Sequence, residues 1–283
     1  MTQQSESLTI SANYQYRGIL WVIIAGVITL LYGNVLWQWG LDLWNDPNYS
    51  HGLFIPLISL YFLKGKINTL RNAETKPSDA GILIVLLALC LFILGYVAGE
   101  FFSKRISFII LLYGIVLFLE GREKIKILRF PILILLFCVP LPYIFYNAVA
   151  FPLKLVATKI AFGFFKLLGF PAFREGNIIT LSHTTLQVVD ACSGIRSLMT
   201  LFTLAFFLAY FRHRHLWKRL LILILAAPLA VLANAIRVTS TGVLTKYNPA
   251  WGEGFLHELS GWIVFVLSFI LLIGISFLMQ KRP

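Results

Sequence analysis

The segment VDACSGIRSLMTLFTLAFFLAYF, residues 189–211, joins a short polar knot to a long apolar run. The run from Cys192 to Phe211 has about the 20 residues that a membrane-spanning helix requires. Cys192 stands at the expected first turn, where helix N–H groups lack intrahelical acceptors and the helix dipole is positive. A thiolate is stabilised there, which lowers the pKa of the thiol and produces a nucleophile. A buried cysteine that serves only as packing is the alternative.

The composition of the whole chain supports a membrane protein. Of 283 residues, 59% are hydrophobic and only 13% are charged, whereas a soluble globular protein is about a quarter charged. We therefore predict an all-α polytopic membrane protein, forming a single integral membrane domain over residues 1–283. The expected spans number about eight, at residues 18–37, 53–63 (or one tilted element over 44–64), 80–98, 106–119, 130 to the prolines at 140 and 142, 192–211, 220–240 and 257–279.

Two segments depart from this pattern. Residues 148–170 are apolar but carry spaced lysines, Lys154, Lys159 and Lys166, which predicts an amphipathic interfacial helix rather than a span. A second span there would reverse the orientation of everything downstream. Residues 173–189 alternate around the turn signal Glu175-Gly176-Asn177, which predicts a small extracytoplasmic β-hairpin.

The net charge of +12 suggests nucleic acid at first, but the positions of the charges argue against it. Most basic residues lie at Arg17, in the loops 64–79, 120–129 and 212–219, and at 281–282. An even number of spans places all of these on one side, as the positive-inside rule expects for the cytoplasm. We predict cytoplasmic termini, retention of the first span and no nucleic-acid partner. His213 and His215 lie in the loop 212–219 and are predicted to be solvated.

Three polar residues are predicted at one depth on the outer side: Cys192, Arg237 near the end of one span, and His257 at the start of another. Ionisable groups at membrane depth are costly and mark function by default. Histidine is able to move protons to and from a cysteine nucleophile. The rigid donor fork of arginine suits an oxyanion. Arg237 as an interfacial anchor and His257 as an interface residue are the alternatives.

Neighbouring residues have supporting roles in this prediction. Asn234 shares a helix face with Arg237 and is placed to orient it. Asp190 caps the helix or orients a partner, and Ser193 and Gly194 offer N–H donors. Arg196 is a rival group for holding the thiolate, and His183 in the hairpin is the rival base. Cys90 and Cys138 read as packing, no candidate ligands share a metal-binding spacing, and no cofactor is expected.

Four motifs carry a family resemblance. Ser50 to Leu57 (SHGLFIPL), Ala191 to Ser197 (ACSGIRS), Asn234 to Val238 (NAIRV) and His257 to Gly261 (HELSG) resemble the motifs of the exosortase/archaeosortase family. Their order, spacing and membrane setting agree over about residues 49–261. His51 belongs to the first motif, and no mechanism is assigned to it. The Ser-Gly-Ile-Arg continuation looks bacterial.

The resemblance implies a membrane-embedded cysteine protease or transpeptidase of the bacterial inner membrane, with Cys192 as nucleophile and Arg237 and His257 as its partners. It implies membrane-anchored substrates with a C-terminal sorting signal, which consists of a Pro-Glu-Pro-like motif, a transmembrane helix and a basic tail. The acidic motif residue would meet Arg174, Arg196 or Arg237. The acceptor is water, or an amine on a lipid or glycan. A transporter and a non-enzymatic assembly factor for exopolysaccharide are the alternative functions.

Overall fold

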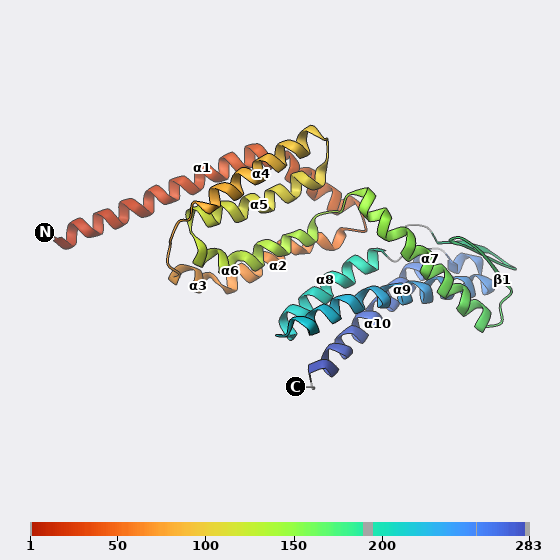
Figure 1. Ribbon diagram of the computed structural model, residues 1–283. Coiled ribbons are helices and arrows are strands. Elements are labelled where there is room, and N and C mark those ends of the chain that lie inside the picture. Colours follow the sequence, from red (N-terminus) through yellow and green to blue (C-terminus); the bar gives the residue numbers. More distant parts are fainter. Residues whose placement is uncertain (1, 189–194, 253, 281–283) are drawn as a thin grey trace. The chain divides into compact units, whose positions relative to one another are not determined.

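The computed structural model describes residues 2–188, 195–252 and 254–280 (Figure 1). The contacts within it define two compact units. The N-terminal unit comprises Met1–Asp46 and Gly52–Pro140, and the C-terminal unit comprises Pro47–His51 and Leu141–Pro283. The prediction of one integral membrane domain over the whole chain remains a prediction.

The N-terminal unit consists of helices. They are α1 (Thr2–Asn45), η1 (Ser50–Phe54, shared with the other unit), α2 (Ile55–Gly65), α3 (Ile67–Asn72), α4 (Ala80–Val97), α5 (Phe101–Leu119), α6 (Arg122–Leu133) and η2 (Ile134–Cys138). Helices α4 and α5 form an antiparallel hairpin (Figure 1). The carboxylate of Glu100 accepts hydrogen bonds from the backbone N–H groups of Phe102 and Ser103 at 2.7 and 2.6 Å, and so caps α5. Helix α1 packs on α5, and the Tyr32 hydroxyl lies 3.0 Å from that of Ser107.

Two predicted spans are interrupted in this unit. The tilted element predicted over residues 44–64 is wrong, because α1 ends at Asn45 and a new helix begins only at Ser50, beyond Pro47. Helix α2 has 11 residues, about 16 Å, and is too short to cross a bilayer. The span predicted from Phe130 is also broken, since α6 ends at Leu133 and η2 follows. The Ser59 hydroxyl donates to the Pro131 carbonyl at 2.7 Å and joins α2 to α6.

The described residues of the C-terminal unit form helices and a sheet. They are α7 (Tyr143–Leu167), β1 (Ala172–Glu175), β2 (Ile178–Leu181), β3 (Thr185–Gln187), α8 (Ile195–Arg212), α9 (Leu216–Tyr247), η4 (Pro249–Gly252) and α10 (Gly254–Gln280). Helices α8, α9 and α10 pack together. Their shared core contains small residues that allow close approach, with larger side chains between them: Leu201, Ala205, Ala209, Ile222, Ala226, Ala230 and Leu272.

The loop between α8 and α9 differs from its prediction. His213 was expected to be solvated, but it is only 4% exposed. Its Nε2 atom lies 2.8 Å from the hydroxyl of Ser276 on α10, which is fully buried. Only three residues connect α8 to α9, and the first of them, His213, is buried against α10 and does not extend into water.

The predicted hairpin is confirmed, and a third strand extends it. The three strands form an antiparallel sheet in the order β1-β2-β3, with Arg174 opposite Ile179 and Ile179 opposite Leu186. The buried side chains of β2 are Ile179 and Leu181, two residues apart, so one face of the sheet points into the core. That face packs on α7 and α9.

The helical, polytopic membrane class is confirmed. Among the described residues, six helices are long and apolar enough to cross a membrane: Gly18–Asn45, Ala80–Val97, Phe101–Leu119, Tyr143–Leu167, Leu216–Tyr247 and Glu258–Gln280. The expected number was about eight. Three predicted spans, at 53–63, from 130 onward and at 192–211, have no counterpart among the six, although α8 (Ile195–Arg212) covers most of the third. Helix α7 adds a span, since an interfacial helix was predicted over 148–170. It begins earlier, directly after Pro142, and its 25 residues are enough for a span.

Candidate functional site

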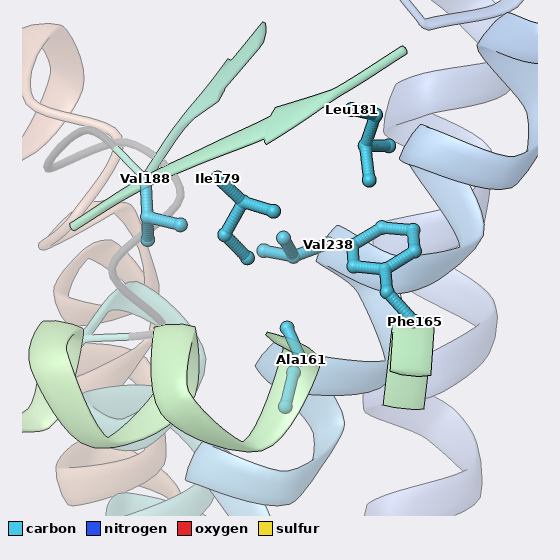
Figure 2. Close-up of a cluster of buried hydrophobic side chains, with 7 residues drawn as sticks. Ala161, Phe165, Ile179, Leu181, Val188 and Val238 are labelled. Atoms are coloured by element: carbon cyan, nitrogen blue, oxygen red, sulfur yellow. The ribbon is translucent and has the colours of Figure 1, made fainter. Parts of the chain in front are cut away.

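The base of the site is a hydrophobic cluster between the sheet and two helices (Figure 2). Strands β2 and β3 contribute from above, α7 contributes from below, and α9 lies between them. The buried members are Ala161, Phe165, Ile179, Leu181, Val188, Ala235 and Val238. Val188 is the last described residue before the predicted nucleophile motif, and Ala235 and Val238 flank Arg237 in sequence. The cluster therefore brings the entry to that motif onto the part of α9 that carries Arg237.

Both backbone polar groups of Val188 are hydrogen-bonded to Asn177. Its backbone N–H donates to the Asn177 carbonyl at 2.9 Å, and its carbonyl accepts from the Asn177 side-chain amide at 2.9 Å. The turn at Glu175-Gly176-Asn177 thus fixes the point where the chain leaves the sheet. Four predicted site residues come next and lie outside the described residues: Asp190, Cys192, Ser193 and Gly194.

Arg237 contacts the neighbouring helix α10. A β-carbon placed on Gly261 would lie 3.0 Å from Cζ and 3.1 Å from Nε of Arg237. The guanidinium of this partly buried arginine therefore rests on the bare α-carbon of Gly261. Asn234, one turn earlier on α9, is only 4% exposed. The predicted placement of Asn234 and Arg237 on one face agrees with their spacing along a continuous helix.

His257 lies in the first turn of α10, and its side chain is outside the description. Residues four apart share one face of a helix. Position 257 is therefore on the face of α10 that includes Gly261, and Gly261 is the residue that Arg237 contacts. Position 237 is on α9 and position 257 is on α10. The two helices are in contact at Gly261, one helical turn after His257.

His183, the rival base, is engaged with α9. Its Nε2 atom lies 2.9 Å from the Gly242 carbonyl, and because a carbonyl only accepts, this nitrogen donates. Helix α9 approaches the sheet closely here, since a β-carbon on Gly242 would lie 2.5 Å from Phe165 and 2.6 Å from Leu186. His183 therefore fastens the β2–β3 turn to α9 five residues beyond Arg237.

The remaining predicted residues occupy three different places. Arg174 donates from Nη1 to the Gly176 carbonyl at 3.0 Å within its own turn. Arg196 is exposed in the first turn of α8. His51 lies in η1, two residues after Tyr49, whose hydroxyl accepts from the Leu141 backbone N–H at 3.3 Å.

Metal ligands do not gather in the described part of the chain. Over residues 2–188, 195–252 and 254–280, no three His, Cys, Asp or Glu side chains come close enough together to hold a metal ion. Of the two cysteines in that part, Cys90 is exposed and Cys138 is buried, where its thiol donates to the Leu135 carbonyl at 2.9 Å.

One family model matches the chain. The model for the transmembrane exosortases (Exosortase_EpsH) covers residues 43–274, from the end of α1 to most of α10. The chain belongs to the transmembrane exosortase family. The matched range includes every residue of the candidate site. No curated protein and no solved structure matches the chain.

Sequence reasoning missed the glycines and the asparagine that support the exosortase site. Gly261 was noted only as the last residue of the HELSG motif and Gly242 was not noted, although an isolated glycine in an apolar helix signals a close approach. Asn177 was taken only as a turn residue. Its side-chain bond to Val188 joins positions 11 apart and has no local pattern.

Proposed function

We propose that this exosortase is a cysteine transpeptidase or protease that cleaves the C-terminal sorting signals of membrane-anchored proteins. The observation that supports this proposal most directly is the contact of Arg237 with Gly261, one helical turn from His257. A second support is that Val188, Ala235 and Val238 belong to one buried cluster. Cys192 is four positions after Val188 in the sequence, and four extended residues reach at most about 14 Å.

The first half-reaction forms a thioester. The Cys192 thiolate attacks the carbonyl carbon of the scissile peptide, a C–S bond forms, and the carbonyl electron pair moves onto oxygen. Arg237 donates hydrogen bonds to that oxyanion. Collapse of the tetrahedral species breaks the C–N bond, and His257, as imidazolium, gives its proton to the departing amine.

The second half-reaction releases the product. Neutral His257 takes a proton from the attacking water or acceptor amine, a new C–O or C–N bond forms, and Cys192 departs as thiolate. Water gives hydrolysis, and an amine on a lipid or glycan gives transfer. The thiolate and the imidazolium are both restored, so this cycle requires no cofactor.

Neighbouring residues support these roles in the proposal. Asn234 orients Arg237 from the same face of α9. The N–H groups of Ser193 and Gly194 supplement the oxyanion donors, and Asp190 orients a catalytic partner or caps α8. Arg196 and Arg174 attract the acidic residue of the sorting motif. His51 is proposed as a further member of the site on its motif alone.

The orientation in the membrane is part of the proposal. The orientation is proposed from the basic loop 212–219 itself and not from the number of spans: four of its eight residues are Arg or Lys, which assigns the ends of α8 and α9 near His213 to the cytoplasm and the Arg237 end of α9 to the outside. A substrate helix with a basic cytoplasmic tail would then present its motif at Cys192. Reporter fusions after Pro283 and in the segment 248–253 test this. A cytoplasmic reporter signal from the latter segment would contradict it.

The function itself is tested by processing in membranes. Wild-type protein and Cys192→Ala are each co-expressed with a reporter protein that ends in a Pro-Glu-Pro motif, a transmembrane helix and a basic tail. We expect loss of the tail fragment only with the wild type. Equal amounts of exosortase on an immunoblot exclude poor expression as the cause.

A further inference from the structure

A cavity opens in the N-terminal unit, among helices that the proposed chemistry does not use. Its volume is about 300 Å³, at the lower end of the range for small-molecule sites. Four lining residues are apolar or aromatic and three are charged: Trp21, Leu70, Val116 and Leu128, with Arg71, Glu120 and Lys124. It lies among α1, α3, α5 and α6. We propose that this cavity binds the phosphate headgroup of an anionic membrane phospholipid.

The depth of the cavity fits a headgroup. Trp21 lies four residues after Arg17, where the apolar run of α1 begins, and Glu120 follows directly after the candidate span that ends at Leu119. Two candidate spans thus reach their ends at the cavity, which places it at the boundary between hydrocarbon and headgroups. Tryptophan is enriched at this level because its ring is apolar and its N–H is polar.

The charges of the cavity fit an anion. The Lys124 Nζ atom lies 2.6 Å from Oε2 of Glu120, and both side chains are only 14% exposed. This ion pair therefore forms one side of the cavity and adds no net charge to it. Arg71 is exposed at the cavity and contributes the additional positive charge. An arginine fork suits a phosphate. The flanking segments 64–79 and 120–129 each contain four basic and two acidic residues, and basic pockets between transmembrane helices bind anionic lipid headgroups.

The apolar walls favour a lipid over free phosphate. Leu70, Val116 and Leu128 offer a surface that inorganic phosphate leaves uncovered, whereas the first carbons of the acyl chains cover it. The size of the cavity limits the bound part to the headgroup and the beginning of the chains. This site does not depend on Cys192, Arg237 or His257.

The test uses the delipidated full chain in dilute detergent, with bound lipid counted by native mass spectrometry. Phosphatidylglycerol and phosphatidylcholine with identical chains are the probes, and inorganic phosphate is the competitor. We expect phosphatidylglycerol to bind more tightly than phosphatidylcholine. Arg71→Gln should weaken phosphatidylglycerol about fivefold, the usual effect of one basic residue near a membrane surface. Leu128→Trp, which fills the cavity, should weaken both lipids.

Lys126→Gln is the matched control, because it removes one charge from a side chain that is 62% exposed on α6 and does not line the cavity. It should change binding less than twofold. Equal binding of the two lipids by the wild type would overturn the proposal. So would an equal loss in Lys126→Gln and Arg71→Gln, which indicates a diffuse field, or displacement of the lipid by equimolar inorganic phosphate.

Discussion

The guanidinium of Arg237 lies on the α-carbon of Gly261, close enough that a β-carbon there would be 3.0 Å from Cζ. Contacts of that length are tighter than ordinary van der Waals packing. A side chain at position 261 would therefore displace the guanidinium of Arg237. Position 261 is one helical turn from His257. In the proposed mechanism this glycine sets the distance between the oxyanion donor and the proton donor.

Gly261→Ala should lower processing without unfolding the protein. The obstructing atoms are the far end of a flexible side chain, so the fold accommodates a methyl group while the guanidinium shifts. Gly261→Leu should shift it further and cost about 100-fold, the effect of a misplacement near 1 Å. Processing rates in membranes measure this. Gly274→Ala is the control on the same helix, because a β-carbon there meets nothing within 4 Å; equal activity of Gly261→Leu and Gly274→Ala would contradict the role of the contact.

Arg237→Lys should lose most of its activity. Lysine keeps the charge but lacks the planar fork, and loss of an oxyanion donor costs about 10²–10³-fold. The cleavage rate at saturating substrate is the measurement, and Arg129→Lys, at an exposed position in the other unit, is the control substitution. Full activity of Arg237→Lys would show that the arginine is only an interfacial anchor.

Substitutions of His257 and His183 distinguish the two candidate bases. His257→Gln should cost about 10²–10⁴-fold, as expected for a general acid–base. His183→Gln removes the hydrogen bond to Gly242, which stabilises by about 1 kcal/mol, and should slightly lower the melting temperature while changing the cleavage rate only a few-fold. If His183→Gln abolished cleavage and His257→Gln did not, the assignment of the base would be reversed.

The burial of His213 should make the stability of the folded protein depend on pH. Burial lowers its pKa below the ordinary 6.5, and the cations of Lys218, Arg212 and Arg219 add to this. At pH 7.5 the imidazole is neutral in both states. As the pH falls through 6.5, the unfolded chain takes up a proton that the folded chain resists, so the free energy of unfolding decreases.

Thermal unfolding in detergent at pH 7.5 and 5.5 measures this effect. The wild type should lose stability on acidification, and His213→Gln should lose less. His215→Gln alters the exposed histidine of the same loop and is the control. An unchanged pH dependence in His213→Gln would exclude His213 as its source.

Local patterns predicted the hydrophobic segments and the hairpin but not how those segments pack. Alternation at Ile178 to Val188 was enough for the hairpin, because period two is visible in the residues themselves. The interruption after Asn45 agrees with the alternative of a separate segment over 53–63, but the burial of His213 was not predicted. Loop charge alone suggested solvent for His213, whereas its environment is decided by Ser276, 63 residues away.

The same limit applies to the candidate site. The spacing of Asn234 and Arg237 was sufficient to place both on one helix face. The contact with Gly261 joins two helices and appears in no local pattern. Asp190, Cys192, Ser193 and Gly194 lie outside the described residues, so their roles depend on the motif and on the proposed chemistry.

The central claim is that Cys192 carries the acyl group of the cleaved substrate. The most direct measurement is mass spectrometry of the exosortase after incubation in membranes with a sorting-signal substrate, followed by rapid quenching at low pH. The account predicts a substrate fragment attached to the peptide containing Cys192, released by neutral hydroxylamine and missing in Cys192→Ala. Processing at the wild-type rate by Cys192→Ala, with no adduct on the wild type, would contradict it.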